Sequence, residues 1–200
     1  MSRTEVRITG FGGQGVVLSG FIIGRAYAVH GGGNATMMQS FGPEARGSAC
    51  SATLVASEDE VLYPYIMERP GIFVAMSADG YETYRDELGD DGILLYEKDL
   101  VHARPKPKQR AFGVPSTRIA EQVGRVIVQN IVMLGFFAAA TALVSREALR
   151  DAVKASVPAG TEDLNLRAFD AGVKYFEDTY GAIGLPVAAG EAGVEAPRRT

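Results

Sequence analysis

The sequence holds few of the residues that build redox or metal centres. Its 200 residues include one cysteine, Cys50, two histidines, His30 and His102, and no tryptophan. A single thiol forms neither an internal disulfide nor a cysteine-ligated cluster, and two histidines far apart in sequence make a poor metal-ligand set. We therefore expect no metal site in this chain, a buried and unreactive Cys50, and a reducing, cytoplasmic location.

An excess of positive charge is also lacking, because the formal net charge is −4 at pH 7. This charge argues against a general nucleic-acid-binding protein. The first ten residues lack the apolar core of a secretory signal. One apolar run, residues 126–145, has the length of a membrane span, but Gln129 and Asn130 interrupt it and its second half is rich in alanine. A buried helix, covered on every side, is the favoured interpretation over a membrane span.

Apolar periodicity switches between strand and helix spacing along the chain. Strands are predicted at residues 6–9, 34–41, 49–57, 71–78 and 92–97. Helices are predicted at residues 15–30, 79–89, 116–124, 145–156 and 161–180, together with the apolar run. This alternation predicts an α/β fold, a three-layer sandwich around a largely parallel sheet, with some antiparallel pairing at a turn over residues 42–48. We expect one domain over residues 1–183 and an extended or disordered tail over residues 184–200.

The motif GFGGQG, residues 10–15, follows the first strand and opens the first helix. It satisfies G-x-G-x-x-G, in which free main-chain N–H groups and the positive end of a helix favour an anion. An NAD site needs an acidic residue about 20 positions on, and residues 34–41 contain none. An ATP-binding P-loop needs a lysine, and here Gln14 is followed by glycine and valine. The loop is therefore suited to bind an anion but lacks the features of an NAD or ATP site. A loop that only packs the helix against the strand is the alternative.

A second motif, SFGPEARGS, spans residues 40–48. Glu44 and Arg46 lie between Pro43 and Gly47, and a rigid turn of this kind can present an arginine to an anionic ligand. A solvated turn with a local ion pair fits the same residues. Further along, Lys106, Lys108 and Arg110 form a proline-spaced basic run that suits a phosphate contact, a contact with a partner's acidic surface, or a solvated loop.

The two motifs together resemble the gamma subunit of 2-oxoacid:ferredoxin (acceptor) oxidoreductases, of the pyruvate, 2-oxoglutarate, indolepyruvate and phenylglyoxylate types. The family pattern is close to G-x-G-G-Q-G followed by Y/F-G-x-E-x-R-G-G, and the resemblance covers about residues 3–180. The apolar segment NIVMLG, residues 130–135, is similar to the family's apolar helix. Ser48 departs from the pattern, since many members have glycine there, so this turn can differ in shape.

The resemblance implies a multisubunit enzyme of oxidative decarboxylation. It converts a 2-oxoacid and coenzyme A to acyl-CoA and CO2 and passes electrons to ferredoxin or to a flavin/NAD subunit. Thiamine diphosphate and [4Fe-4S] clusters would lie on partners, namely thiamine-binding alpha/beta-type subunits and an iron–sulfur subunit. This chain would carry no catalytic residue, would be inactive alone, and would help to bind CoA and to assemble the complex.

The resemblance also implies a set of binding residues: Gly10, Gly12, Gly13, Gln14, Gly15, Glu44, Arg46 and Gly47. In this set the glycine loop would meet a CoA phosphate or pantetheine amide, Gln14 would donate and accept at the loop tip, and Arg46, oriented by Glu44, would contact the anion. Two other functions fit the residues. One is a freestanding dinucleotide-binding oxidoreductase, and the other is a purely structural assembly subunit.

Overall fold

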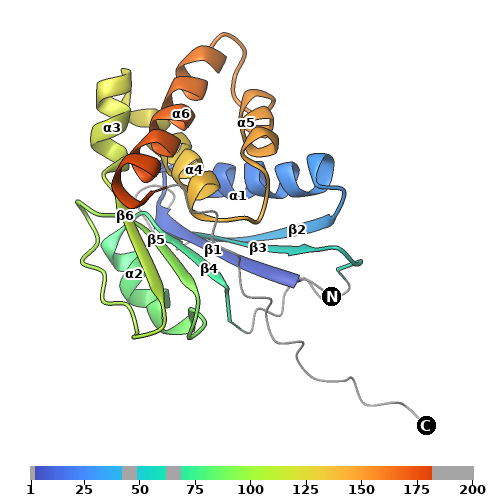
Figure 1. Ribbon diagram of the computed structural model, residues 1–200, viewed down its shortest axis with the longest axis vertical. Helices are drawn as coiled ribbons and strands as arrows, with labels where there is room; N and C mark the ends of the chain where they lie inside the picture. The colour runs from blue at the N-terminus through green and yellow to red at the C-terminus, as the bar shows by residue number, and fades with distance from the viewer. Residues whose placement is uncertain (1–2, 42–48, 62–68, 182–200) are drawn as a thin grey trace.

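The computed structural model describes residues 3–41, 49–61 and 69–181. In this part of the chain a six-stranded sheet has helices on both faces. Helix α2 (Ala78–Tyr84) covers one face, and the other five α-helices gather on the opposite face (Figure 1). The predicted three-layer α/β sandwich is therefore confirmed. The expected boundary at residues 183/184 falls outside the described residues.

The sheet has the strand order β2-β3-β1-β4-β5-β6. Its strands are β1 (Arg3–Phe11), β2 (Asn34–Phe41), β3 (Ala49–Ser57), β4 (Ile72–Ala75), β5 (Ile93–Glu97) and β6 (Arg110–Val114). Strand β3 pairs antiparallel with β1 and β2, while β1, β4, β5 and β6 pair parallel with one another. The expectation of a largely parallel sheet with some antiparallel pairing is confirmed. Strand β6 was missed by the sequence pattern, because a five-residue strand containing a glycine carries little periodicity.

The helices on the crowded face are α1 (Val16–Arg25), α3 (Ser116–Val123), α4 (Gln129–Ala140), α5 (Arg146–Lys154) and α6 (Glu162–Tyr180). Helix α1 continues as a π-helical turn over Ala26–His30, so the predicted helix over residues 15–30 is confirmed in extent. The apolar run is less regular than predicted. A 3-10 turn over Val126–Val128 precedes α4, and the chain is extended at Thr141.

Helix α4 forms the centre of the crowded face. All of its residues except Gln129 are buried, so the burial predicted for the run of residues 126–145 is confirmed for residues 130–140, whereas Val126 and Ile127 in the preceding turn are 43% and 72% exposed. Among the described residues, no helix combines the length and apolarity that crossing a bilayer requires. The main chains of α4 and α6 touch, since a Cβ atom at Gly135 would fall on the Phe169 carbonyl oxygen and one at Gly172 on the Val132 carbonyl oxygen.

Strands β1 and β4 are parallel neighbours whose chains leave the sheet in opposite directions. Strand β1 leads to α1 on the crowded face, whereas β4 leads to α2 on the other face (Figure 1). Such a topological switch point opens a crevice at the carboxyl ends of the strands, where α/β proteins bind ligands. The loop of residues 11–15 lies at this crevice.

Gly135→Ala is expected to destabilise the fold by about 2–3 kcal/mol, because the new methyl group overpacks the α4–α6 contact. Urea denaturation of both proteins measures the difference. Gly89→Ala is the matched control, since a Cβ atom there meets only Pro70 O, at 3.6 Å, and Asp91 Oδ1, at 3.8 Å, and its effect should stay within about 0.5 kcal/mol. Equal stability of the two variants would contradict direct main-chain packing of the helices.

Candidate functional site

The glycine loop turns the chain from β1 into α1. The N–H group of Gln14 donates to Phe11 O over 3.0 Å. Gly13 and Gly15 have φ angles of 99° and 74°, the left-handed region that side-chain-bearing residues rarely adopt. Gly12 and Gly13 are exposed. The turn therefore presents main chain, rather than side chains, at the switch point.

The side-chain amide of Gln14 holds this turn against the neighbouring strand. Its Oε1 accepts a hydrogen bond from the Phe11 N–H group over 2.7 Å, and its Nε2 donates to Met76 O over 3.1 Å. A Cβ atom at Gly10 would approach Oε1 to 2.6 Å, so Gly10 leaves room for the amide. Both functional ends of Gln14, which the sequence assigned to the loop tip as donor and acceptor, bind the protein itself.

The first turn of α1 is open to an anion. Gly15 is its N-cap residue, no side chain caps it, and the turn contains no acidic residue. Helices α2 and α5 differ, because Ser77 and Ser145 cap them and Asp79 and Glu147 lie in their first turns. The uncapped N–H groups and the helix dipole favour a phosphate or carboxylate at the start of α1.

Asn130 adds a polar group that the sequence analysis did not assign to the site. It lies in the first turn of α4, is 3% exposed, and its amide packs against Gly15. The signal in the sequence was the polar break at Gln129 and Asn130 inside the apolar run, which alone does not show what the amide meets.

A buried carboxylate caps the neighbouring helix α3. Glu97 ends β5 and accepts hydrogen bonds from the Ser116 hydroxyl and, over 3.0 Å, from the Thr117 N–H group. The Thr117 hydroxyl in turn donates to Gln129 Oε1 over 2.9 Å. This chain of hydrogen bonds ties the start of α4 to the start of α3.

The binding residues predicted in the second motif, Glu44, Arg46 and Gly47, lie outside the described residues. The strands on either side are described, and their ends are in register with the glycine loop: Phe41 pairs with Cys50, and Cys50 pairs with Gly10. The sheet thus brings the chain before and after residues 42–48 to the edge at which the glycine loop lies.

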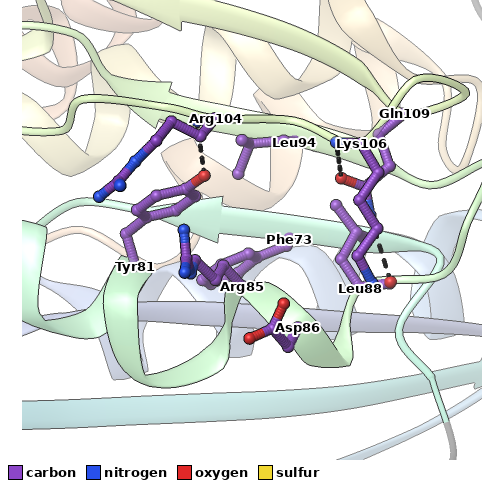
Figure 2. A pocket seen from close by; sticks show the side chains of 9 residues that line it. All are labelled: Phe73, Tyr81, Arg85, Asp86, Leu88, Leu94, Arg104, Lys106 and Gln109. Atoms are coloured by element: carbon purple, nitrogen blue, oxygen red, sulfur yellow. Dashed lines mark hydrogen bonds between the residues drawn. The ribbon is translucent and has the colours of Figure 1, made fainter.

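The basic run lies away from this site. Arg110 is the first residue of β6 and pairs with Ile93, the first residue of β5. It therefore lies at the amino ends of the parallel strands, whereas the glycine loop lies at their carboxyl ends. Lys106 lines a cavity on the α2 face with Tyr81, Arg85 and Gln109 (Figure 2). This run therefore lies apart from the glycine loop, and its contact with a phosphate or with a partner's acidic surface stays a prediction.

The cavity in Figure 2 is a packing feature. It encloses about 30 Å³, which is room for about one water molecule. The main-chain N–H group of Arg104 donates to the Tyr81 hydroxyl over 2.7 Å, and Gln109 Nε2 donates to Gly89 O over 3.0 Å. These bonds fasten the loop before β6 to the α2 layer.

Cys50 is a buried residue of β3, and burial raises the pKa of its thiol. A raised pKa lowers the thiolate fraction, so Cys50 is a poor nucleophile; its interpretation as a buried strand residue is confirmed. Within residues 3–41, 49–61 and 69–181, no group of three or more His, Cys, Asp or Glu side chains is arranged to hold a metal ion.

The fold and loop together define an α/β domain whose exposed glycine loop lies at a topological switch point. The sequence matches the pyruvate ferredoxin/flavodoxin oxidoreductase family over residues 5–175. The chain belongs to this family, and its resemblance to the gamma subunits of 2-oxoacid:ferredoxin oxidoreductases is confirmed.

Individual relatives agree with this assignment. The 2-oxoglutarate synthase subunit KorC of Methanothermobacter thermautotrophicus is 46% identical, with 85% of this chain and 93% of the relative covered. The keto/oxoacid ferredoxin oxidoreductase gamma subunit of Geobacter sulfurreducens superposes with a TM-score of 0.75 at 34% identity, covering 86% of this chain and 96% of that one.

A 2-oxoglutarate:ferredoxin oxidoreductase from Magnetococcus marinus, solved with 2-oxoglutarate, coenzyme A and succinyl-CoA bound, shares the fold. Its TM-score is 0.80 at 21% identity, and the match covers 94% of this chain and 33% of that one. In that protein the equivalent domain is one part of a longer chain.

Gln14→Glu is expected to destabilise the protein by about 1–2 kcal/mol at pH 7, because a carboxylate replaces the donor that faces Met76 O. The facing Met76 carbonyl oxygen raises the pKa of the new carboxyl group in the folded state. The loss of stability relative to the wild type should therefore shrink as the pH falls toward 5. Urea denaturation at both pH values measures it. Gln122→Glu, an exposed change on α3, is the control; an equal deficit at pH 7 and 5 would contradict the bridging role.

Proposed function

We propose that this chain is the gamma subunit of a 2-oxoacid:ferredoxin oxidoreductase and that its glycine loop binds part of coenzyme A. The enzyme would convert a 2-oxoacid anion and CoA to acyl-CoA, CO2, one proton and two electrons, and the electrons would pass to ferredoxin or another acceptor. The similarity to a 2-oxoglutarate synthase subunit supports 2-oxoglutarate as the first substrate to test.

One observation carries the CoA assignment: exposed, bare main chain at Gly12 and Gly13 adjoins an uncapped helix start at the switch point. CoA carries a diphosphate and a 3′-phosphate, and such groups bind at helix N-termini through main-chain N–H groups. A Cβ atom at Gly13 would meet nothing within 4 Å, so the loop has open space beside it for a ligand. The missing acidic residue after β2 and the missing P-loop lysine disfavour NAD and ATP.

The role of this chain would be to position the acyl acceptor. Thiamine diphosphate on a partner subunit would supply the carbon chemistry, and iron–sulfur clusters on partners would carry the electrons. The glycine loop would hold the anionic part of CoA so that its thiol reaches the reacting carbon, and positioning of this kind contributes several kcal/mol to barrier lowering.

Assembly into a complex is the second part of the proposal. An apolar groove of about 400 Å³ runs beside α1 and β2, lined in part by Met37 and Leu54. Phe21 and Val29 at this groove are 50% and 66% exposed, and exposed apolar surface of this kind is typical of interfaces. The thiamine-binding subunits that the family resemblance implies are the proposed partners, and the covalent link of the equivalent Magnetococcus domain to further chain supports assembly with other domains of the enzyme.

A purely structural subunit is the competing function, and the groove favours it as much as it favours the proposal. The two differ only in whether the glycine loop contacts CoA. A substitution in the loop that leaves assembly intact therefore separates them.

Gly13→Val in the assembled complex is expected to raise the CoA KM at least about tenfold, because the side chain blocks the loop and removes hydrogen bonds to phosphate. The assay is 2-oxoglutarate-dependent reduction of ferredoxin at varied CoA. Gly160→Val is the matched control, since Gly160 also has a positive φ, 83°, with nothing within 4 Å of its Cβ position. An assembled Gly13→Val complex with an unchanged CoA KM would refute the CoA role.

A further inference from the structure

Asn130 carries a buried amide nitrogen that the folded chain does not use. The residue is 3% exposed, and its Nδ2 has no hydrogen-bond partner among the residues that the structure describes. Buried side-chain donors are otherwise nearly always paired, because an unmade hydrogen bond costs free energy. An unpaired donor of this kind calls for a partner from outside the described chain.

The amide lies directly on the glycine loop. A Cβ atom at Gly15 would stand 2.5 Å from both Cγ and Nδ2 of Asn130. Gly15 is therefore glycine for two reasons, its left-handed φ and the close approach of the Asn130 side chain. The last residue of the loop and the first turn of α4 are therefore in direct contact.

Two helix starts meet at this contact, and neither carries a compensating charge. Helices α1 and α4 have no capping side chain and no acidic residue in the first turn. Among the other described α-helices, α2 and α5 have an acidic residue in the first turn, α6 has two, and Glu97 caps α3. The positive ends of α1 and α4 thus converge where an anion would gain from both.

The start of α4 is held in place before any ligand binds. Gln129, the neighbour of Asn130, accepts the hydrogen bond from Thr117, which also donates from its N–H group to Glu97. This link to α3 fixes the orientation of the first turn of α4, so the unpaired donor is pre-positioned beside the loop.

Building on the proposed function, we propose that Asn130 donates from Nδ2 to the diphosphate of bound CoA, and that the binding site is shared between the starts of α1 and α4. Asn130 is a binding residue in this arrangement and takes no part in bond making. A diphosphate suits the site because it offers anionic oxygens to two helix starts at once.

The test replaces Asn130 by leucine in the assembled complex. Leucine has nearly the same branched shape and no donor, so the thermal unfolding midpoint should stay equal to that of the wild type or rise. The Kd for CoA, measured by calorimetry, should rise about tenfold through loss of a hydrogen bond to a charged group. Pantetheine, which lacks the diphosphate, should bind the variant and the wild type equally.

Asn165→Leu on α6 is the matched control. Asn165 is also buried, but its Nδ2 donates to Thr161 O over 2.8 Å and to Thr161 Oγ1 over 3.1 Å. Its replacement should lower the unfolding midpoint and leave the Kd for CoA unchanged. The two variants therefore separate a donor kept for a ligand from a donor that stabilises the fold.

An unchanged Kd for CoA in Asn130→Leu overturns the assignment, as does an equal weakening of pantetheine binding. If Gly13→Val still weakens CoA binding in that case, the proposed function stands without Asn130; if it does not, the proposed function fails as well.

Should the leucine variant not fold, Asn130→Asp is the second variant, because it brings its own negative charge to the two helix starts. Inorganic pyrophosphate should raise the unfolding midpoint of the wild-type chain and leave that of Asn130→Asp unchanged; no stabilisation of the wild type, or equal stabilisation of both, would overturn the proposal.

Discussion

The bridge made by the Gln14 amide is the interaction on which the site depends. It joins Phe11 N, at the end of β1, to Met76 O, just beyond the end of β4. The two strands send their chains to opposite faces of the sheet, so this side chain spans the switch point and sets the shape of the loop. The bare Gly10 gives it room. With the loop fixed in this way, the chain enters α1 without a capping side chain, and the space beside Gly13 is open.

Helix α4 connects this loop to the stability of the whole domain. It is buried along almost its entire length, and its main chain touches α6 at Gly135. Its first turn lies on Gly15 and is anchored through Gln129 to the start of α3. The same helix therefore packs the core and brings an amide group to the site, so changes in the α4–α6 contact should be transmitted to the loop.

The site that emerges is made mostly of main chain, with little acid–base or nucleophilic chemistry. Among the described residues, Cys50 is buried, and the buried carboxylate of Glu97 caps α3. Such a site suits a chain that holds a phosphorylated carrier while partners carry out the reaction, which agrees with membership of a family of 2-oxoacid oxidoreductases. The apolar groove beside α1 is lined by residues of α1, β2 and β3 and contains none of the glycine-loop residues.

The sequence by itself determined the local features: the strand–glycine–helix opening, the β2–β3 antiparallel pair and the burial of residues 130–140. These follow from periodicity and glycine conformation, which neighbouring residues set. Only the tertiary structure decided that Gln14 bonds to a carbonyl 62 residues away, that Asn130 meets Gly15, that the apolar helix ends at Ala140, and that Lys106 lies on the other face. Each depends on which distant main-chain and side-chain groups the sheet order brings together, and a polar residue's identity does not reveal its partner.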